Sequence, residues 1–529
     1  MSWDPKARQG FESRKIRWEI VPWTRGKGLD IGCGMQKPFE HFIGVDNGMD
    51  AQLFGHPISP DVRSDANDLS IFASGTMDFC FSSHLIEHFS YERVPEILKE
   101  WMRVIKVGGY LVLYLPDEDQ YPNVGEAGSN SDHKWNVNQT RVLEAMPEGY
   151  DLIDYQVRSE EDEYSLYFVF KKTDSGRALS YQTRARPKKT VGVIRYGAFG
   201  DLMQASSVFA GLKRQGYHVT LFSSPPGCDV VSHDPNIDQH ILQDKDQVPN
   251  RELGDYWAYW HKKFDKFVNL SESVEGTFLA MPGRVQHEWP AGLRHKMMNL
   301  NYLQHAHELS GVPDEISVRF YATDEEKRWA KETRSKMGKT VVMWQLAGSS
   351  RMHKTYPYLD EIVARLMISY PQVDVVLTGG PECMELEAGW EEEPRVHRMS
   401  GKWTIRQTLA FLDETDVIVG AETGVLNAAA CLPQPKIVFL SHSTRNNLTR
   451  DWTNTVALSA PHVTCPGRGN NEAPACHMLH YTFEHCKKGD QKGVAECMEK
   501  IHPALAWDAI QTAINKGKAR KPLLQVVGA

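Results

Sequence analysis

The sequence lacks any long apolar run, and this absence excludes the integral membrane proteins with helical spans. No stretch of about 18 consecutive apolar residues occurs in the 529-residue chain, so we predict no membrane-spanning helix. The first twenty residues, MSWDPKARQGFESRKIRWEI, contain no apolar segment of the kind found in a secretory signal. We therefore expect a cytoplasmic protein, in which the nine cysteines stay reduced.

The chain also lacks an excess of basic residues. Its 60 Lys and Arg are outnumbered by 68 Asp and Glu, which gives a formal net charge of −8. A negatively charged protein repels phosphate backbones, so nucleic acid is not the expected partner. Hydrophobic residues make up 41% and charged residues 24% of the chain, as in ordinary globular proteins. Because 529 residues are too many for one hydrophobic core, we predict several domains.

Three blocks of alternating strands and helices follow one another along the sequence. Strands that alternate with helices form parallel sheets covered on both faces, so the predicted fold class is α/β with doubly wound domains. The segments predicted in order are strands 27–32, 42–45 and 77–82, helix 91–104, strands 110–115, 166–170 (the last of the first sheet) and 190–195, helix 202–215, strands 218–223 and 341–345, helix 358–370, strand 373–378, helix 405–412, strand 417–419, a helix from 424 and strand 436–440.

Residues 173–189 interrupt this pattern, because they are polar and basic and have no apolar periodicity. Such a segment is typical of a linker. The predicted organisation is therefore a first domain at 1–172, a linker at 173–189, domains at 190–335 and 336–516, and a tail at 517–529.

A glycine-rich segment, Gly28-Leu-Asp-Ile-Gly-Cys-Gly34, spans the end of the first predicted strand and the turn after it. Glycines allow the backbone to approach a ligand closely, and a carboxylate at the end of a strand can accept from a hydroxyl or an amine. Asp46 ends the second strand, where an acid suits the hydroxyls of a ribose. Together these features predict a nucleotide-cofactor site.

Five motifs in order, from this turn to Lys106-Val-Gly-Gly109, resemble the class I S-adenosylmethionine-dependent methyltransferases over residues 25–172. The resemblance implies a Rossmann-like domain that uses S-adenosyl-L-methionine. It further implies the following contacts: Asp30, Gly32 and Gly34 around the methionine part, Asp46 at the ribose, Asp65 and Ala66 near the adenine, and Ser82 and His84 near the methyl group.

A dinucleotide-binding fold is the alternative explanation of the glycine-rich turn. Its fingerprint, G-x-G-x-x-G, needs a third glycine three places after the second. In this chain that position is Lys37. The spacing therefore favours the methyltransferase.

Histidines near the predicted methyl site are candidates for chemistry. His84 and His88 have i,i+4 spacing, and Glu87-His88 is predicted to begin a helix. The order H-L-I-E-H differs from the zinc motif H-E-x-x-H and offers no third ligand, so we predict no metal. Either His84 or His133 is a candidate general base for a hydroxyl that receives the methyl group.

The second and third blocks carry another set of polar residues at strand ends. Asp201 begins a predicted helix, where it either caps the helix or presents a carboxylate at the ligand-binding edge of a sheet. A loop with Ser349 and Lys354 offers hydroxyl and cationic groups that suit phosphate oxygens. Residues 422–424, Glu-Thr-Gly, open a helix in the manner of a pyrophosphate site.

These features resemble the heptosyltransferase family, inverting glycosyltransferases of the GT-B fold, over residues 190–512. The resemblance implies a nucleotide-sugar donor, a glycan-type acceptor and Asp201 as the general base. It further implies that the donor is bound by six residues: Ser349, Lys354, Glu382, Glu422, Thr423 and Gly424. Two departures leave the sugar open: Glu422 replaces the family's Asp, and Asn427 its histidine.

Four cysteines lie near the C-terminal end: Cys465, Cys476, Cys486 and Cys497. No two of them have the C-x₂₋₄-C spacing of a zinc site. A similar cysteine-rich segment occurs in the glycosyltransferase family. We predict that it orders a loop, with a metal site or a disulfide as the alternatives.

The sequence thus predicts a bifunctional transferase that methylates and adds a sugar to a glycan or a related acceptor. Two alternatives stay open. One is a virus-type enzyme that modifies DNA or nucleotides, and the other is a protein in which one half is a non-catalytic binding module.

Overall fold

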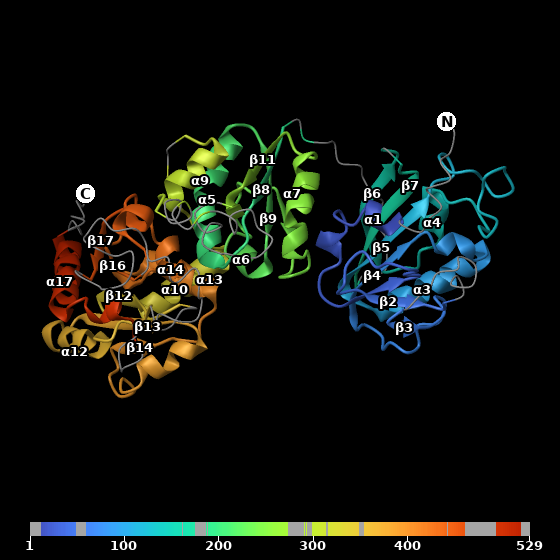
Figure 1. Ribbon diagram of the computed structural model, residues 1–529. Helices are drawn as coiled ribbons and strands as arrows, with labels where there is room; N and C mark the ends of the chain where they lie inside the picture. The colour runs from blue at the N-terminus through green and yellow to red at the C-terminus, as the bar shows by residue number, and fades with distance from the viewer. Residues whose placement is uncertain are drawn as a thin grey trace, which may run out of the picture. The chain divides into compact units, whose positions relative to one another are not determined.

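The computed structural model describes residues 12–48, 60–160, 162–174, 187, 189–272, 290, 293, 299–313, 316–348, 354–441, 443–460 and 494–519. The chain divides into unit 1, residues 1–186 with 242–249, and unit 2, residues 187–241 with 250–529 (Figure 1). Most of the predicted linker and tail lies outside the described residues, as do Ser349, Cys465, Cys476 and Cys486. Both units are mixed α/β structures with parallel strands, as the sequence predicts.

Unit 1 contains a seven-stranded sheet in the order β3-β2-β1-β4-β5-β7-β6. Its first five strands pair in parallel, whereas β7 is antiparallel to both β5 and β6. The strands are β1 (Gly28–Ile31), β2 (Ile43–Asp46), β3 (Val62–Arg63), β4 (Met77–Ser83), β5 (Ile105–Pro116), β6 (Tyr150–Arg158) and β7 (Ser165–Lys172).

The strand predicted at 166–170 is the last of this sheet along the chain, but it does not lie at the edge of the sheet. That strand is β7, which lies inside the sheet, and β6 forms the edge instead. The sequence of β6, YDLIDYQVR, mixes charged and apolar residues, and only three of its nine residues are buried. Such an edge strand has no continuous apolar run from which it could be predicted.

One helix of unit 1 corresponds to the helix predicted at 91–104. The segment predicted as one helix at 91–104 is a 3-10 turn, η4 (Tyr91–Arg93), followed by α3 (Val94–Val104). Five apolar residues at helical spacing are buried in α3: Val94, Ile97, Leu98, Trp101 and Met102. The remaining helices are α1 (Glu12–Lys15), η2 (Val21–Trp23), η3 (Ile86–His88) and α4 (Gln139–Ala145).

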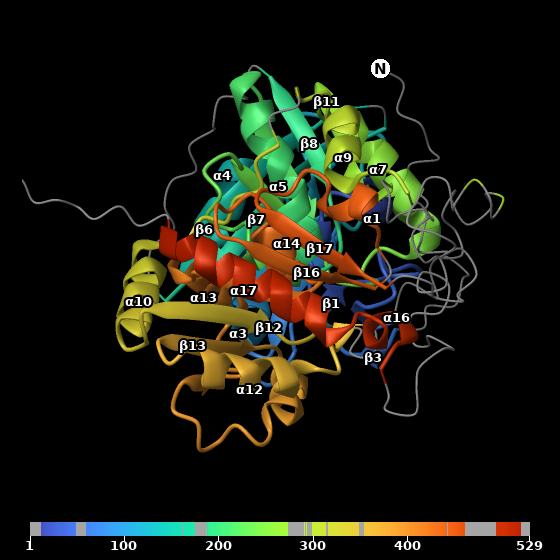
Figure 2. The ribbon, with the colours of Figure 1, turned by 90° about the vertical axis from the view of Figure 1, so that its left-hand side faces the viewer.

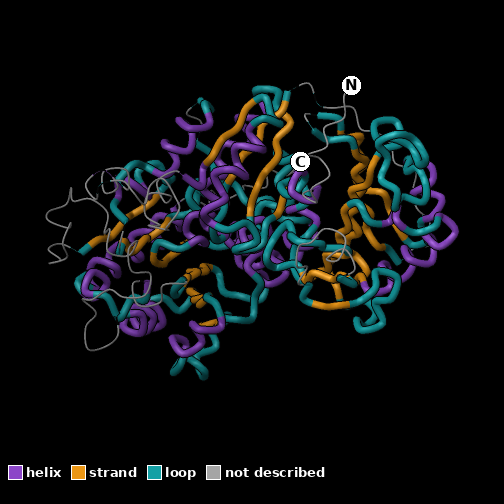
Figure 3. The backbone as a smooth tube through the Cα atoms, turned by 45° about the vertical axis from the view of Figure 1, so that its right-hand side comes forward, coloured by secondary structure: helices purple, strands orange, loops and turns teal. Residues whose placement is uncertain are grey.

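Unit 2 contains two sheets, visible in Figure 1 and as strands in Figure 3. The four-stranded sheet has the order β10-β9-β8-β11, and the six-stranded sheet has the order β14-β13-β12-β15-β16-β17 with every pair parallel. The strands are β8 (Thr190–Ile194), β9 (His218–Ser223), β10 (Gln239–Leu242), β11 (Lys266–Asn269), β12 (Thr340–Gln345), β13 (Val373–Thr378), β14 (Val396–Arg398), β15 (Val417–Ala421), β16 (Lys436–Leu440) and β17 (Thr455–Ser459).

Helices cover both faces of the six-stranded sheet. Helices α12 and α17 lie on one face, which is turned toward the viewer in Figure 2, and α13 and α14 lie on the other. The helices of unit 2 are α5 (Phe199–Arg214), α6 (Pro225–Asp229), η5 (Asn250–Glu252), α7 (Leu253–His261), η6 (Leu270–Glu272), α9 (Tyr302–Ser310), α10 (Asp324–Ser335), α12 (Leu359–Ser369), η9 (Pro381–Glu387), α13 (Ile405–Phe411), η10 (Leu412–Glu414), α14 (Gly424–Ala428), η11 (Arg445–Thr449), α16 (Glu496–Glu499) and α17 (Pro503–Ala519).

The core of unit 2 joins its two sheets. Side chains of β12 alternate between the faces of the sheet, so that Val342 and Trp344 pack with α12 and α17. Val341 and Met343 belong to a second cluster, which also contains Val191 and Val193 of β8. The two sheets therefore share one hydrophobic core. Among the described residues of both units, no helix has the length and apolarity needed to cross a bilayer.

Candidate cofactor and donor sites

The predicted cofactor residues of unit 1 lie where its strand order reverses. From β1 the chain continues to β2 and β3 on one side and then returns to β4 on the other. Ligands of open α/β sheets bind beyond the carboxyl ends of the strands at such a point. Asp30, Asp46 and Ser82 lie at or next to the carboxyl ends of β1, β2 and β4.

The turn after β1 has the geometry that requires glycine. Gly32 and Gly34 have φ angles of 75° and 53°, in the left-handed region. A methyl group on Gly32 would lie 2.6 Å from Cδ2 of Leu85, so no larger residue fits there without a shift. Around Gly34, no atom of the described residues lies within 4 Å of the corresponding position, which leaves space for a ligand.

The Asp46 carboxylate holds this turn in place. Its Oδ2 accepts from the backbone N–H of Gly34 at 3.1 Å, and its Oδ1 accepts from that of Gly48 at 2.7 Å. A carboxylate oxygen has two lone pairs, so both oxygens keep acceptor capacity. Asp46 can therefore position the turn and still accept from hydroxyl groups.

Asp30 carries a buried carboxyl group beside the same turn. Only 2% of the residue is exposed, and its Oδ2 has no hydrogen-bond partner among the described residues. Burial raises the pKa of this carboxyl well above its usual range, with Lys37 opposing and Asp46 adding to the rise. A buried polar atom without a partner is unfavourable, so a hydrogen-bond donor from a bound ligand would stabilise this carboxyl group.

The segment that is predicted to lie near the adenine, Asp65-Ala66, is held in place by hydrogen bonds. Asp65 is exposed, and its Oδ1 accepts from the N–H of Asn67 at 3.1 Å. The carbonyl oxygen of Ala66 accepts from the indole Nε1 of Trp101 at 2.6 Å. The side chain of Asp65 faces solvent, whereas Ala66 is fixed to helix α3.

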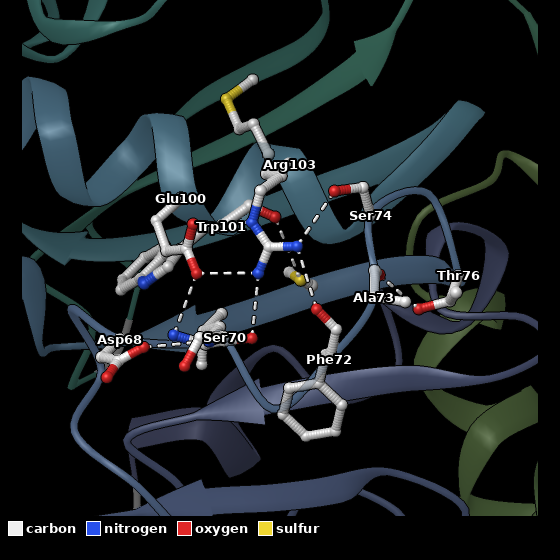
Figure 4. A network of polar contacts seen from close by, with 12 residues as sticks. Asp68, Ser70, Phe72, Ala73, Ser74, Thr76, Glu100, Trp101 and Arg103 are labelled. Atoms are coloured by element: carbon white, nitrogen blue, oxygen red, sulfur yellow. Dashed lines mark hydrogen bonds and ion pairs between the residues drawn. The ribbon is translucent and has the colours of Figure 1, made fainter.

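Figure 4 shows the network that anchors the residues after this segment. The guanidinium of Arg103 donates to the carbonyl oxygens of Leu69 and Phe72, both at 2.9 Å, and to Oγ of Ser74 at 3.0 Å. Glu100 accepts from the same guanidinium and from the N–H of Leu69. The loop between β3 and β4 is thus tied to helix α3 by charged groups.

Ser82 occupies the predicted edge but uses its hydroxyl within the sheet. The side chain is fully buried, and its Oγ donates to the carbonyl oxygen of Ile31 at 2.9 Å. This bond ties β4 to β1. The hydroxyl of Ser82 therefore supports the strand end that carries His84.

His84 lies outside any helix, with a φ of 50°. The helix predicted to begin at Glu87-His88 is only the 3-10 turn η3, so His84 and His88 do not form a helical i,i+4 pair. Nε2 of His84 lies 2.9 Å from Oγ of Ser165. Burial lowers the pKa of the imidazole well below its usual range, and His133 and Lys15 add to that effect. His84 is therefore neutral at pH 7.

The structure brings His133 to Glu87 and His88. Oε1 of Glu87 lies 3.7 Å from Nε2 of His133 and 3.7 Å from Nδ1 of His84, and the rings of His88 and His133 are 5.0 Å apart. Burial raises the pKa of Glu87 to about 8 and, with His88, lowers that of His133 to about 4. Sequence reasoning missed this cluster because His133 lies in a distant loop.

Asp201 caps helix α5 in unit 2. It is the third residue of the helix, and its Oδ2 accepts from the N–H of Ala198 at 2.7 Å. Its Oδ1 lies 3.2 Å from Nη2 of Arg195, which is nearly buried. The side chain of Asp201 keeps 20% exposure. The carboxylate thus serves as a cap and an ion-pair partner while it remains accessible.

Two glycines lie in contact where helices α5 and α14 begin. A methyl group on Gly200 would lie 2.7 Å from Cα of Gly424 and 3.1 Å from Nδ2 of Asn427. This contact places the first turn of α5 against that of α14. The predicted base, Asp201, and the predicted phosphate turn at Thr423 therefore lie in the same region of unit 2.

Lys354 and Thr423 converge on Gly348. A methyl group on Gly348 would lie 3.4 Å from Cδ of Lys354, 3.4 Å from Cγ2 of Thr423 and 3.8 Å from Nζ of Lys354. Only 3% of Thr423 is exposed, and its Oγ1 has no hydrogen-bond partner among the described residues. A cation and an unpartnered hydroxyl thus flank one glycine.

The two predicted acids of the donor site differ in their surroundings. Glu422 is nearly buried, and its oxygens accept from the backbone N–H groups of Ser441 at 2.6 Å and Ser443 at 3.0 Å. Glu422 therefore holds the loop after β16. Glu382 is exposed in the first turn of η9.

Residues 29–113 match a family model described as a methyltransferase domain. A search of curated protein sequences found no match.

Three solved structures illustrate the similarities. A glycosyl transferase family 9 protein from Veillonella parvula is 16% identical, with 63% of this chain and 100% of that chain covered and a TM-score of 0.45. The E. coli ADP-heptose lps heptosyltransferase II is 13% identical, with 62% and 99% covered and a TM-score of 0.44. A SAM-dependent methyltransferase from Archaeoglobus fulgidus is 20% identical, with 30% and 92% covered and a TM-score of 0.24. Residues 29–113 of unit 1 are thus similar to a methyltransferase domain family.

Proposed function

We propose that the chain is a bifunctional transferase, with S-adenosylmethionine-dependent methyl transfer in unit 1 and inverting glycosyl transfer from a nucleotide-sugar in unit 2. The methyltransferase match at residues 29–113 carries the first half. The convergence of Lys354 and Thr423, together with the Gly200–Gly424 contact, supports the second.

The residues around the first glycine turn fit the parts of S-adenosyl-L-methionine. The Oδ2 of Asp30, which has no hydrogen-bond partner among the described residues, would accept from the ammonium of the methionine part, with Gly32 and Gly34 beside it. Asp46 accepts from the ribose hydroxyls with its remaining lone pairs. The adenine would lie beside Asp65 and Ala66, whose loop is anchored as Figure 4 shows.

Methyl transfer to an oxygen needs a group that accepts the hydroxyl proton. The bound cofactor supplies an activated methyl group on its sulfonium. His84 and His133 are both neutral at pH 7 because burial lowers their pKa values, so each can accept a proton. The left-handed backbone of His84 holds its ring at the end of β4, next to the proposed cofactor.

In unit 2, Asp201 is the proposed base for the acceptor hydroxyl. Lys354 and Thr423 donate to the diphosphate of the donor, together with the backbone N–H of Gly424. Ser349, which lies outside the described residues, is the further hydroxyl donor that the sequence predicts. Glu382 is proposed to contact the donor sugar or nucleotide. Glu422 acts indirectly, since its oxygens accept from the backbone N–H groups of Ser441 and Ser443.

A non-catalytic unit 2 is the second candidate. The observation that favours it is the pairing of Asp201 with Arg195 and with the N–H of Ala198, because such contacts stabilise the carboxylate and weaken it as a base. Under this alternative, unit 2 binds a nucleotide-sugar or a glycan but transfers nothing.

Isothermal titration and product analysis test the proposal. The full chain should bind S-adenosyl-L-methionine, and Asp46→Ala should weaken that binding, whereas Asp151→Asn on edge strand β6 should not. Mass spectrometry of candidate glycan acceptors, incubated with the cofactor and a panel of nucleotide-sugars, should show both modifications. Absence of cofactor binding, or undiminished binding by Asp46→Ala, would overturn the methyltransferase half.

A further inference from the structure

The Glu87 carboxyl group is fully buried, and neither of its oxygens has a hydrogen-bond partner among the described residues. A buried carboxyl group in this state is unfavourable unless a donor or a cation compensates it. Two imidazole nitrogens approach it, Nδ1 of His84 and Nε2 of His133, both 3.7 Å from Oε1. These separations are too long for hydrogen bonds.

The 3.7 Å separation between Oε1 of Glu87 and Nε2 of His133 suits two atoms that share a metal ion. In a tetrahedral site with bonds of about 2.0–2.1 Å, neighbouring donor atoms lie about 3.4 Å apart. One donor atom each from Glu87, His88 and His133 falls within 4.8 Å of the other two. Small side-chain adjustments would therefore bring all three donors into bonding range.

The backbone already holds the two segments together. The N–H of Lys134 donates to the carbonyl oxygen of Glu87 at 2.8 Å, and Nε1 of the buried Trp135 donates to that of Ile86 at 3.3 Å. His133 itself is only 8% exposed. The cluster is thus built into the fold on both sides rather than left on a loose surface loop.

We propose that Glu87, His88 and His133 bind one divalent first-row transition-metal ion. Imidazole ligands favour Zn²⁺, Co²⁺, Ni²⁺ or Fe²⁺ over Mg²⁺ and Ca²⁺, which prefer all-oxygen sites. Three protein ligands leave a coordination position for water or for an oxygen of a bound molecule. With Nε2 of His133 on the metal, the proposed base in unit 1 is His84.

The site goes beyond the proposed methyl transfer, because an ion can bind whether or not the cofactor does. Metal binding and binding of S-adenosyl-L-methionine are therefore measured separately on the same full-length protein. Metal binding without cofactor binding would support this site and count against the methyltransferase, and the reverse result would do the opposite.

The test uses chelator-treated full-length protein titrated with Zn²⁺ and with Co²⁺. We expect Glu87→Gln and His133→Gln each to weaken one equivalent of binding at least about 100-fold, more than the loss of an outer-shell partner. His41→Gln, a matched change in unit 1, should bind as the wild type does. Circular dichroism shows whether each variant is folded. If Glu87→Gln or His133→Gln does not fold, metal binding is measured with His88→Gln instead.

Co²⁺ absorption separates this site from the cysteines near the C-terminal end. A nitrogen and oxygen site shows d–d bands without the thiolate charge-transfer band that cysteine ligands give. Loss of these d–d bands in Glu87→Gln, with no thiolate charge-transfer band in the wild type, would support the proposal. Unchanged binding in all folded variants, or equally tight binding of Mg²⁺, would overturn it.

Discussion

Gly200 of helix α5 lies against Gly424 of helix α14, so that a methyl group on Gly200 would lie only 2.7 Å from Cα of Gly424. Helix α5 follows a strand of the four-stranded sheet, and α14 follows a strand of the six-stranded sheet. The glycine contact therefore brings the carboxyl edges of the two sheets together. Asp201 and Thr423, which adjoin these glycines, owe their proximity to it.

Gly200→Ala should destabilise unit 2, because the added methyl group meets backbone that cannot rotate away. Overpacking of this kind costs about 1–3 kcal/mol. Urea unfolding measures the loss, and binding of a nucleotide-sugar should weaken with it. Gly254→Ala in α7, where no described atom lies within 4 Å of the new methyl group, is the matched control and should not destabilise the protein. Equal stability of the two variants would contradict the tight contact.

The affinity for S-adenosyl-L-methionine should fall as the pH is lowered, beginning above the range in which ordinary aspartates take up a proton. Burial raises the pKa of Asp30, so its carboxyl group takes up a proton at a higher pH than an ordinary aspartate does. Protonation removes the negative charge that faces the cofactor's ammonium. Isothermal titration at decreasing pH should show weak, pH-independent binding for Asp30→Asn. A wild-type affinity that is flat over the same pH values would show that Asp30 does not pair with the cofactor.

Thr423→Val and Lys354→Ala should weaken the binding of a nucleotide-sugar to unit 2. A hydrogen bond to a charged group contributes about 1.5–3 kcal/mol, which corresponds to roughly a 10- to 150-fold loss of affinity. Lys402→Ala, at an exposed lysine of the same unit, should leave the affinity unchanged. Binding of S-adenosyl-L-methionine, measured in the same variants, should also stay unchanged. A loss of both ligands together would indicate general damage to the protein.

Asp201→Asn separates a catalytic unit 2 from a binding module. The amide oxygen of Asn can still accept from the N–H of Ala198 and cap α5, but the side chain cannot accept the acceptor's proton. If Asp201 is the base, kcat for sugar transfer should fall at least about 100-fold, while KM for the donor changes little. Steady-state kinetics with a nucleotide-sugar measures both constants. Transfer at the wild-type rate would rule out Asp201 as the base.

Much of the fold could be predicted because its buried strands have simple apolar runs. Strands β13 and β16 have the predicted bounds, 373–378 and 436–440, and every residue in them is buried. Parallel strands buried on both faces carry continuous runs of this kind. Strand β6 was not predicted because it lies at the edge of the sheet and its sequence mixes charged and apolar residues.

The sequence by itself determined the α/β class, the glycine turn at 28–34 and the acids at the strand ends, because local spacing encodes strand ends and tight turns. Only the tertiary structure decided which polar groups meet. His133 reaches Glu87 through backbone bonds between distant segments, and Asp201 meets Arg195 as their carboxylate and guanidinium pair across a turn. Tertiary packing likewise decided that Asp30 and Glu87 hold buried oxygens with no hydrogen-bond partner among the described residues, since desolvation depends on the packing of the whole unit rather than on neighbouring residues.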